Sequence, residues 1–149
     1  MAFERLSEQL AIVATIDPEA YTTATTVSSD MINMENHHEA MFVIMLGTVA
    51  ASTTVDFDVL EATASATGTN TTTAVASITQ LGATDDDKQV VVTVRGEDMA
   101  DGYSYLKGVL TIGGVGGTVD LGAVAFGDRA RYKPASVNDL ASVDEIVNA

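Results

Sequence analysis

Alternating apolar and polar residues occupy most of this chain and predict β-strands. Val55, Phe57 and Val59 alternate with two aspartates, which is typical of a strand with one buried side and one solvent-facing side. Gln89 to Val94 is the strongest β-branched run of the chain, and Thr118 to Phe126 alternates again. About six to eight such strands, separated by regular turn signals, predict an all-β fold, an antiparallel β-sandwich or jelly-roll-like domain.

One strand pattern is a continuous apolar run. Ala40 to Val49 contains almost only apolar residues, which predicts a central strand buried on both faces. The short polar segment 51–54 then predicts a hairpin to the strand that holds Val55. Tyr103 to Ile112 is a further alternating strand, and the glycines between Gly113 and Gly117 predict a tight reversal after it.

The beginning of the chain shows a different periodicity. Phe3, Leu6 and Leu10 recur at three- and four-residue spacing and predict a short amphipathic helix over residues 1–16. Asp17-Pro18 ends this helix, because proline disfavours the helical conformation of the residue before it. Phe3, Leu6 and Leu10 are therefore the candidate contacts of an arm that reaches a neighbouring molecule.

These patterns divide the chain into three parts. We expect residues 1–30 to form a helical or extended N-terminal arm, because Tyr21 to Asp30 is rich in Thr and Ser and has little apolar surface to bury. Residues 31–135 are expected to form the β-sandwich domain. Residues 136–149 are expected to form a short C-terminal helix or tail, since their first residues have the spacing of a capping box.

Composition and charge narrow the classes of function. The 149 residues include 7 Lys+Arg and 21 Asp+Glu, which gives a formal net charge of −14 at pH 7. Such an acidic surface repels phosphate, so we expect no nucleic-acid partner and no attachment to an anionic membrane. The chain has no cysteine, which excludes a disulfide scaffold and a cysteine-ligated metal site. No apolar stretch approaches the roughly 20 residues of a membrane span.

Candidate catalytic and metal-ligating groups are few. His37-His38-Glu39 lacks the helical His-Glu-x-x-His spacing of a zinc site, and a solvated turn is the preferred interpretation. Asp85 to Asp87 could attract a divalent cation, but the ligand spacing of an EF-hand is absent and a charged turn is preferred. Gly113 to Gly117 lacks the Lys and Ser/Thr of a phosphate-binding loop. We therefore expect no catalytic residue, no metal and no cofactor.

Three of the seven basic residues lie within five positions, at Arg129, Arg131 and Lys133. At period two their side chains would share one face of an extended segment, which Pro134 ends. We call these residues the basic strip. One interpretation is a local counter-charge to the protein's own acidic surface. The other is a docking strip for an acidic surface on a partner protein.

The stretch from Ile32 to Ser136 resembles a family of small virion proteins of tailed bacteriophages, which are encoded among the head genes. Some members are assigned as capsid decoration or cement proteins. The order and spacing of several segments carry the resemblance: Ile32-Asn33-Met34, Ala40 to Ile44, Leu46-Gly47-Thr48, Val55 to Ala62, Gly102 to Leu106, Ala123 to Gly127, and Arg129 to Pro134.

The resemblance implies a structural protein that binds the outside of a bacteriophage capsid and stabilises the shell. The implied partners are the major capsid protein, which the basic strip would contact, and copies of this chain, as a trimer or another homo-oligomer. The implied location is the capsid surface of the virion, after synthesis in the cytoplasm of the bacterial host. Another virion part, such as a head-completion or tail protein, is an alternative. A carbohydrate-binding module is a weaker one, because the chain has no Trp on which a sugar could stack.

Overall fold

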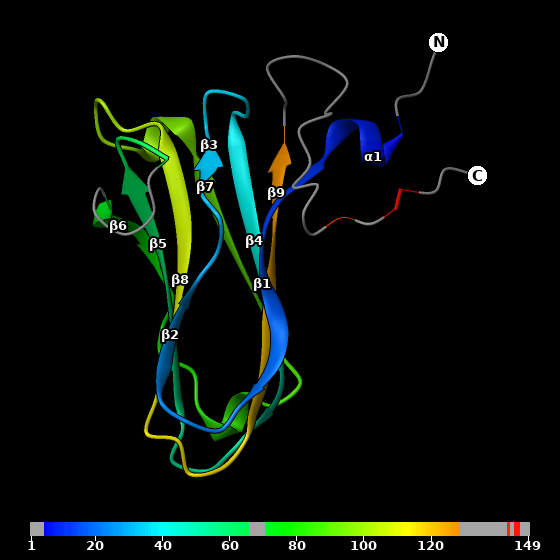
Figure 1. Cartoon of the computed structure of the whole chain (residues 1–149), viewed down its shortest axis with the longest axis vertical. Helices are drawn as coiled ribbons and strands as arrows, with labels where there is room; N and C mark the ends of the chain where they lie inside the picture. The colour runs from blue at the N-terminus through cyan, green and yellow to red at the C-terminus, as the bar shows by residue number, and fades with distance from the viewer. Residues whose placement is uncertain (1–4, 66–70, 129–142, 144, 147–149) are drawn as a thin grey trace.

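Two antiparallel β-sheets face each other and form a sandwich (Figure 1). The computed structural model describes residues 5–65, 71–128, 143 and 145–146. Its elements in chain order are α1 (Leu6–Gln9), β1 (Ala11–Tyr21), β2 (Thr25–Ser28), β3 (Ile32–Asn33), β4 (Glu39–Val49), β5 (Thr54–Ala62), β6 (Thr71–Ser77), η1 (Ala83–Asp85), β7 (Gln89–Arg95), η2 (Gly96–Asp98), β8 (Tyr105–Gly113) and β9 (Val119–Asp128). Among these residues, no helix is long and apolar enough to cross a membrane.

The order of the strands is that of a jelly roll. One sheet, called sheet A here, has the order β1-β9-β4-β7, and the other, sheet B, has the order β2-β8-β5-β6 with the short β3 paired to β8. Without β3, the first, last, third and sixth strands share one sheet, and the second, seventh, fourth and fifth share the other. This arrangement confirms the prediction of an antiparallel β-sandwich with jelly-roll character.

The core lies between the two sheets and is built from the predicted alternation. Val55, Phe57 and Val59 on β5 are buried, as expected. The rings of Phe42 on β4 and Phe57 pack at 5.6 Å between centroids, tilted by 59°. Gly108 on β8 makes room for them, because a Cβ there would lie 2.7 Å from Phe57 Cζ. Small residues therefore set the spacing around the few large side chains.

The predicted N-terminal helix is wrong from Ala11 onward. Within the described part of residues 1–16 only Leu6–Gln9 is helical, and Ala11–Tyr21 forms β1, which pairs along β9. The β-branched residues of this segment suit a strand. A short apolar run fits the periodicity of a helix and that of a strand almost equally well, so the pairing with β9 decides the outcome. Pro18 does not end the element. It lies in an edge strand, where the register with β9 shifts between Ile16 and Glu19.

Both predicted hairpins are also wrong, although the strands beside them are correct. The segment 50–53 connects β4 in sheet A to β5 in sheet B, and the segment 114–118 connects β8 in sheet B to β9 in sheet A. These connections therefore cross between the sheets instead of joining neighbours in one sheet. Gly114, with a φ of 56°, still supplies the left-handed conformation that the second connection needs.

Two further predictions concern residues 21–30, at the end of the predicted arm, and residues 136–149. Within Tyr21 to Asp30, residues Thr25–Ser28 are extended and pair with β8, so that part of the predicted arm packs on the sandwich. The predicted helix over residues 136–149 lies almost entirely outside the described residues. The three that are described there, Val143, Glu145 and Ile146, belong to no helix or strand.

Candidate docking face

The outer side of sheet A carries apolar side chains that do not contribute to the core. Alternation along its four strands turns one residue in two away from sheet B. We call the outward apolar residues the outer apolar face, and they are Ile12, Met41, Val43, Met45, Val91, Val124 and Phe126. None of them belongs to the core cluster or to the apolar residues packed against it. Val91 is 58% exposed and Met45 is 44% exposed.

These side chains form a continuous surface because strand pairing places them side by side. Phe126 on β9 pairs with Ile12 on β1 and with Met41 on β4. In the next row, Val43 on β4 pairs with Val124 on one side and with Val91 on the other. Directly opposed residues on one side of a sheet are in contact range. The prediction that the β4 run is buried on both faces is therefore wrong, since its outer half faces away from the core.

The outer side of sheet B is polar, and its carboxylates have partners within the molecule. The Ser77 hydroxyl donates a hydrogen bond to Asp58, and the Gln80 side-chain amide donates to both carboxylate oxygens of Asp56, at 3.1 and 2.9 Å. This is the wet face that the alternation of β5 predicted. The outer side of sheet A differs, because Met45 and Val91 are exposed there and the other five members of the outer apolar face are half-buried.

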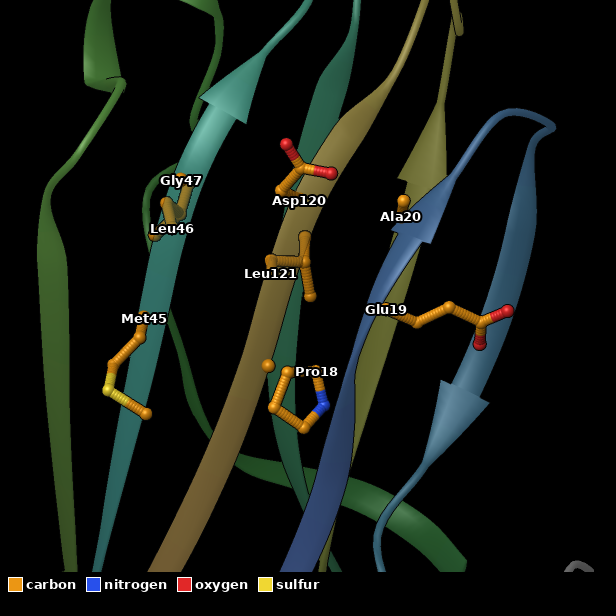
Figure 2. A pocket seen from close by; sticks show the side chains of 9 residues that line it. Pro18, Glu19, Ala20, Met45, Leu46, Gly47, Asp120 and Leu121 are labelled. Atoms are coloured by element: carbon orange, nitrogen blue, oxygen red, sulfur yellow. The ribbon is translucent and has the colours of Figure 1, made fainter.

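A shallow hollow of about 420 Å³ lies at one end of the outer apolar face (Figure 2). Pro18 of β1 lies over Gly122 of β9, where a Cβ would be only 2.9 Å from Pro18 Cα. Met45 lines the side formed by β4. Figure 2 shows the Asp120 carboxylate at the upper rim and the Glu19 carboxylate directed away from the proline. The hollow suits an apolar side chain of a partner better than an anionic ligand.

Acidic residues border the outer apolar face at both ends. At one end, Glu39 of β4 lies opposite Asp128 of β9 in the strand register. At the other end, Asp120 lies beside the hollow. Arg95 of β7 lies opposite Glu39 in the strand register, on the other side of β4. A partner that covers this face would therefore present apolar side chains in its centre and basic residues at its rim.

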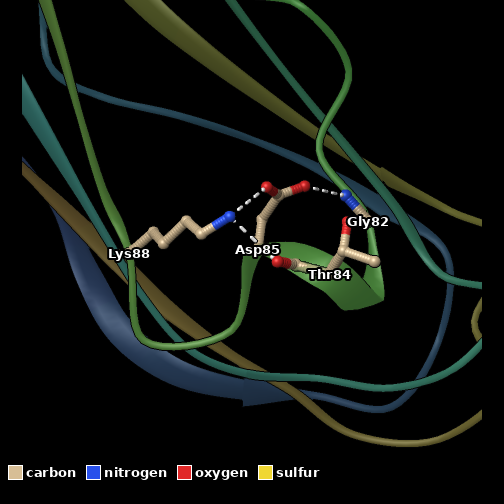
Figure 3. A network of polar contacts seen from close by, with 4 residues as sticks. All are labelled: Gly82, Thr84, Asp85 and Lys88. Carbon is tan, nitrogen blue, oxygen red and sulfur yellow. Dashed lines mark hydrogen bonds and ion pairs between the residues drawn. The ribbon is translucent and has the colours of Figure 1, made fainter.

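The acidic residues before β7 form a charged turn, as the preferred interpretation held (Figure 3). One Asp85 oxygen accepts the Gly82 N–H at 3.0 Å, and the other pairs with Lys88 Nζ at 3.0 Å. These two contacts, the backbone bond first, hold the pKa of Asp85 below its usual value. Asp86 accepts the Val49 N–H at 2.7 Å. Within the described part of the chain, no group of three His, Asp or Glu residues is arranged to hold a metal ion.

His37 is buried, contrary to the predicted solvated turn, whereas His38 is exposed. The His37 ring lies against Gly127, where a Cβ would be 2.6 Å from Nδ1, and this nitrogen has no hydrogen-bond partner. Burial lowers the pKa of His37, and the nearby Asp128 opposes this effect. The different burial of the two adjacent histidines agrees with the expectation that they face different sides.

The predicted site residues remain largely outside the described residues. This applies to Phe3 of the arm and to Arg129, Arg131 and Lys133 of the basic strip. Leu6 lies on α1 and is 68% exposed, and Leu10 is half-buried just before β1. The outer apolar face was not predicted. Its signal in the sequence was the unbroken apolar run of β4. From sequence alone, this run fits a strand buried on both sides and a strand with one exposed docking side equally well.

Comparisons with known proteins give a fold and no family. No protein-family model matches the chain, and no curated protein matches its sequence. A chain in the structure of infectious bursal disease virus, Gx strain, matches with a TM-score of 0.52 and 12% identity, over 85% of this chain and 35% of that one. A chain of the Gt strain gives a TM-score of 0.49 and 10% identity over the same shares. This chain spans about a third of the length of those chains, and the likeness shows a shared fold alone.

Proposed function

We propose that this chain is a structural protein of a virion, bound to the outside of a bacteriophage capsid as a decoration or cement protein. The observation that carries the proposal is the outer apolar face with its acidic ends. The jelly-roll fold, which also occurs in a virus structure, supports the proposal, as does the sequence resemblance to phage head proteins. A protein of this kind acts by burying surface on its partner and needs no catalytic groups.

In this proposal the outer apolar face covers a joint between copies of the major capsid protein. The partner surface is apolar with Lys or Arg at its rim, because Glu39, Asp120 and Asp128 border the face. An apolar side chain of the partner occupies the hollow beside Pro18. Many copies on one shell act together, so that a modest affinity of each contact is sufficient.

Two segments from the sequence analysis have roles in the same proposal. The basic strip of Arg129, Arg131 and Lys133 contacts an acidic surface on one of the partners, either the major capsid protein or a further copy of this chain. The N-terminal residues Phe3, Leu6 and Leu10 contact a neighbouring molecule. Leu6 supports this role, because a large apolar side chain that is 68% exposed gains from being covered.

The decisive experiment measures the protein in purified particles of the phage that encodes it. We expect gel densitometry to find it in high copy number relative to the major capsid protein. Met45→Lys, on the outer apolar face, should greatly reduce this occupancy while the purified variant stays folded. Thr26→Lys is the matched control, because it adds the same charge at an exposed position on sheet B and should leave occupancy unchanged.

Three results would contradict the proposal. Absence of the protein from particles excludes a virion role altogether. A copy number that fits a single ring would identify a head-completion or tail component instead. Equal loss of occupancy in Met45→Lys and Thr26→Lys would show that the outer apolar face is not the attachment surface.

A further inference from the structure

Strand β7 is an edge of sheet A with backbone hydrogen-bonding groups that no other described strand uses. Among the described residues it is the last strand of its sheet and pairs only with β4. Two hydrogen bonds show which residues of β7 face β4: Leu46 N–H donates to the Lys88 carbonyl at 2.9 Å, and Gly96 N–H donates to the His38 carbonyl at 3.0 Å. In an antiparallel pair, alternate residues bond to the partner and the others point their backbone groups outward.

The outward groups on β7 belong to the same residues that expose their side chains. Gln89, Val91 and Thr93 direct their N–H and C=O groups away from β4, and all three side chains are exposed. No described residue forms a backbone bond with these groups. The next outward N–H, that of Arg95, donates to the Asp98 carboxylate at 2.9 Å and so closes the end of the edge. The free part of the edge thus covers residues 89–93.

The opposite edge of the same sheet, strand β1, is protected against the addition of another strand, whereas β7 is not. Strand β1 contains Pro18 and two register shifts, and both features hinder the addition of another strand. Strand β7 has no proline, no register shift with β4 and a β-branched sequence from Val90 to Val94. Natural proteins leave an edge of this kind unprotected where another chain pairs with it.

Acidic residues flank the free edge at both ends. Asp85, Asp86 and Asp87 precede β7, and Glu97 and Asp98 follow it. Two of these acids are paired with basic residues, Asp85 with Lys88 at 3.0 Å and Glu97 with Arg95 at 3.3 Å, so that Asp86, Asp87 and Asp98 leave both ends of the edge net negative. An extended segment with several positive charges fits this edge by both backbone pairing and charge.

We propose that β7 is the acceptor strand for residues 129–133 of a neighbouring copy of this chain. That segment holds Arg129, Arg131 and Lys133 in five residues and ends before Pro134, which cannot donate a ladder hydrogen bond. Its length equals that of the free edge, residues 89–93. The proposal deepens the proposed function by naming the partner of the basic strip. It leaves the outer apolar face for the major capsid protein.

The same molecule cannot supply the segment. β9 ends at Asp128, which lies beside Glu39 of β4, and β7 is the next strand beyond. A strand added outside β7 lies three strand spacings from β9, about 14 Å away. Five extended residues span at most about 17 Å, so residues 129–133 cannot both cross this distance and lie along β7. The pairing must therefore join two molecules, head to tail, which leads to a ring or a chain of copies.

Peptide binding tests the acceptor edge directly. The probe is a synthetic peptide of residues 127–136, added to the full-length variant Arg129→Ala/Arg131→Ala/Lys133→Ala. We expect NMR signals of the Val91 and Thr93 amides to shift and the binding to weaken with salt. Thr93→Pro removes an outward N–H and should lower the affinity by about tenfold, the effect of one lost hydrogen bond. Thr93→Lys, which keeps the backbone, serves if the proline variant does not fold.

Sedimentation equilibrium tests the same contact between whole molecules. We expect the wild-type chain to associate reversibly, and the triple-alanine and Thr93→Lys variants to be monomeric. Thr26→Lys, the same change on another edge strand, should associate like the wild type. Unshifted β7 amides at about millimolar peptide, or unchanged association of the triple-alanine variant, would refute the proposal. Both measurements need only purified protein, so they can fail while particle occupancy succeeds, and the reverse.

Discussion

Met45 and Leu46 form a matched pair that tests which side of β4 faces the core. The two residues are adjacent and close in size, yet Leu46 is 4% exposed within the core cluster and Met45 is 44% exposed on the outer apolar face. Changing each to Ala removes a similar number of atoms from opposite sides of one strand. Differences in strand propensity affect the two variants almost equally, so their comparison isolates burial.

The structure predicts a clear difference in stability between the two variants. Leu46→Ala removes three buried carbons, worth about 0.8 kcal/mol each, and leaves a cavity, so we expect a loss of about 3 kcal/mol. Met45→Ala removes three side-chain atoms that are already about half in water and leaves no cavity, so we expect about 1 kcal/mol. For a domain of this size these losses correspond to falls in Tm of about 6–12 °C and about 2–4 °C.

Urea denaturation followed by circular dichroism measures both changes, provided that the m-value stays constant. Particle occupancy should show the reverse order, since Met45→Ala removes a docking contact and leaves the core intact. Equal loss of stability in the two variants would refute the assigned orientation of β4. A larger loss for Met45→Ala would show that its side, and not that of Leu46, faces sheet B.

Three further predictions concern the core, the acidic turn and the buried histidine. Gly108→Ala places a methyl 2.7 Å from the Phe57 ring and should cost about 1–3 kcal/mol, measured by thermal melting. Asp86→Ala leaves a β4 backbone N–H without its 2.7 Å partner and should cost about 1–2 kcal/mol, whereas Asp86→Asn should restore part of it in urea titrations. Burial lowers the pKa of His37, so the folded state binds fewer protons than the unfolded state. Its contribution to stability is complete above the unfolded pKa of 6.5 and is lost as the pH falls through the lower folded value. Urea unfolding at several pH values should show this slope in wild type and in His38→Gln, and its loss in His37→Gln.

The strands of the two sheets were largely predictable because alternation reports which side of a strand is buried. β5, β7, β8 and β9 lie where the pattern placed them, and the buried residues of β5 are those expected. The partners of the strands were not predictable. The segments 50–53 and 114–118 carry the polar residues and glycines of a tight turn, but the same residues suit a short crossing from one sheet to the other.

The errors at Ile12 to Ile16 and at His37 have one physical cause. Local sequence states what a segment prefers alone, and long-range packing decides the outcome. Ile12 to Ile16 becomes a strand because β9 offers a ladder of backbone partners more than a hundred residues away. His37 is buried because Gly127 leaves room for its ring, a contact that no spacing rule around the histidine contains.

The candidate site was visible in the sequence only as an excess of apolar residues. The run of β4 exceeds what one buried side needs, and its outer half, Met41, Val43 and Met45, forms the centre of the outer apolar face. Periodicity could not distinguish this from two-sided burial, because both require apolar residues at every position. Knowledge of the sheet order was needed to see that sheet B covers only the other side of sheet A.

The pairing of β1 with β9 has a consequence for how the protein is made. Ala11 pairs with Gly127, and β9 lies between β1 and β4 in sheet A. A ribosome must therefore deliver the residues up to Asp128 before this sheet gains its central strand. Until then β1 and β4 have no common neighbour, and the nascent chain exposes apolar strands. Contacts of such long sequence separation slow folding, so we expect folding after translation and a dependence on chaperones while the sheet is open.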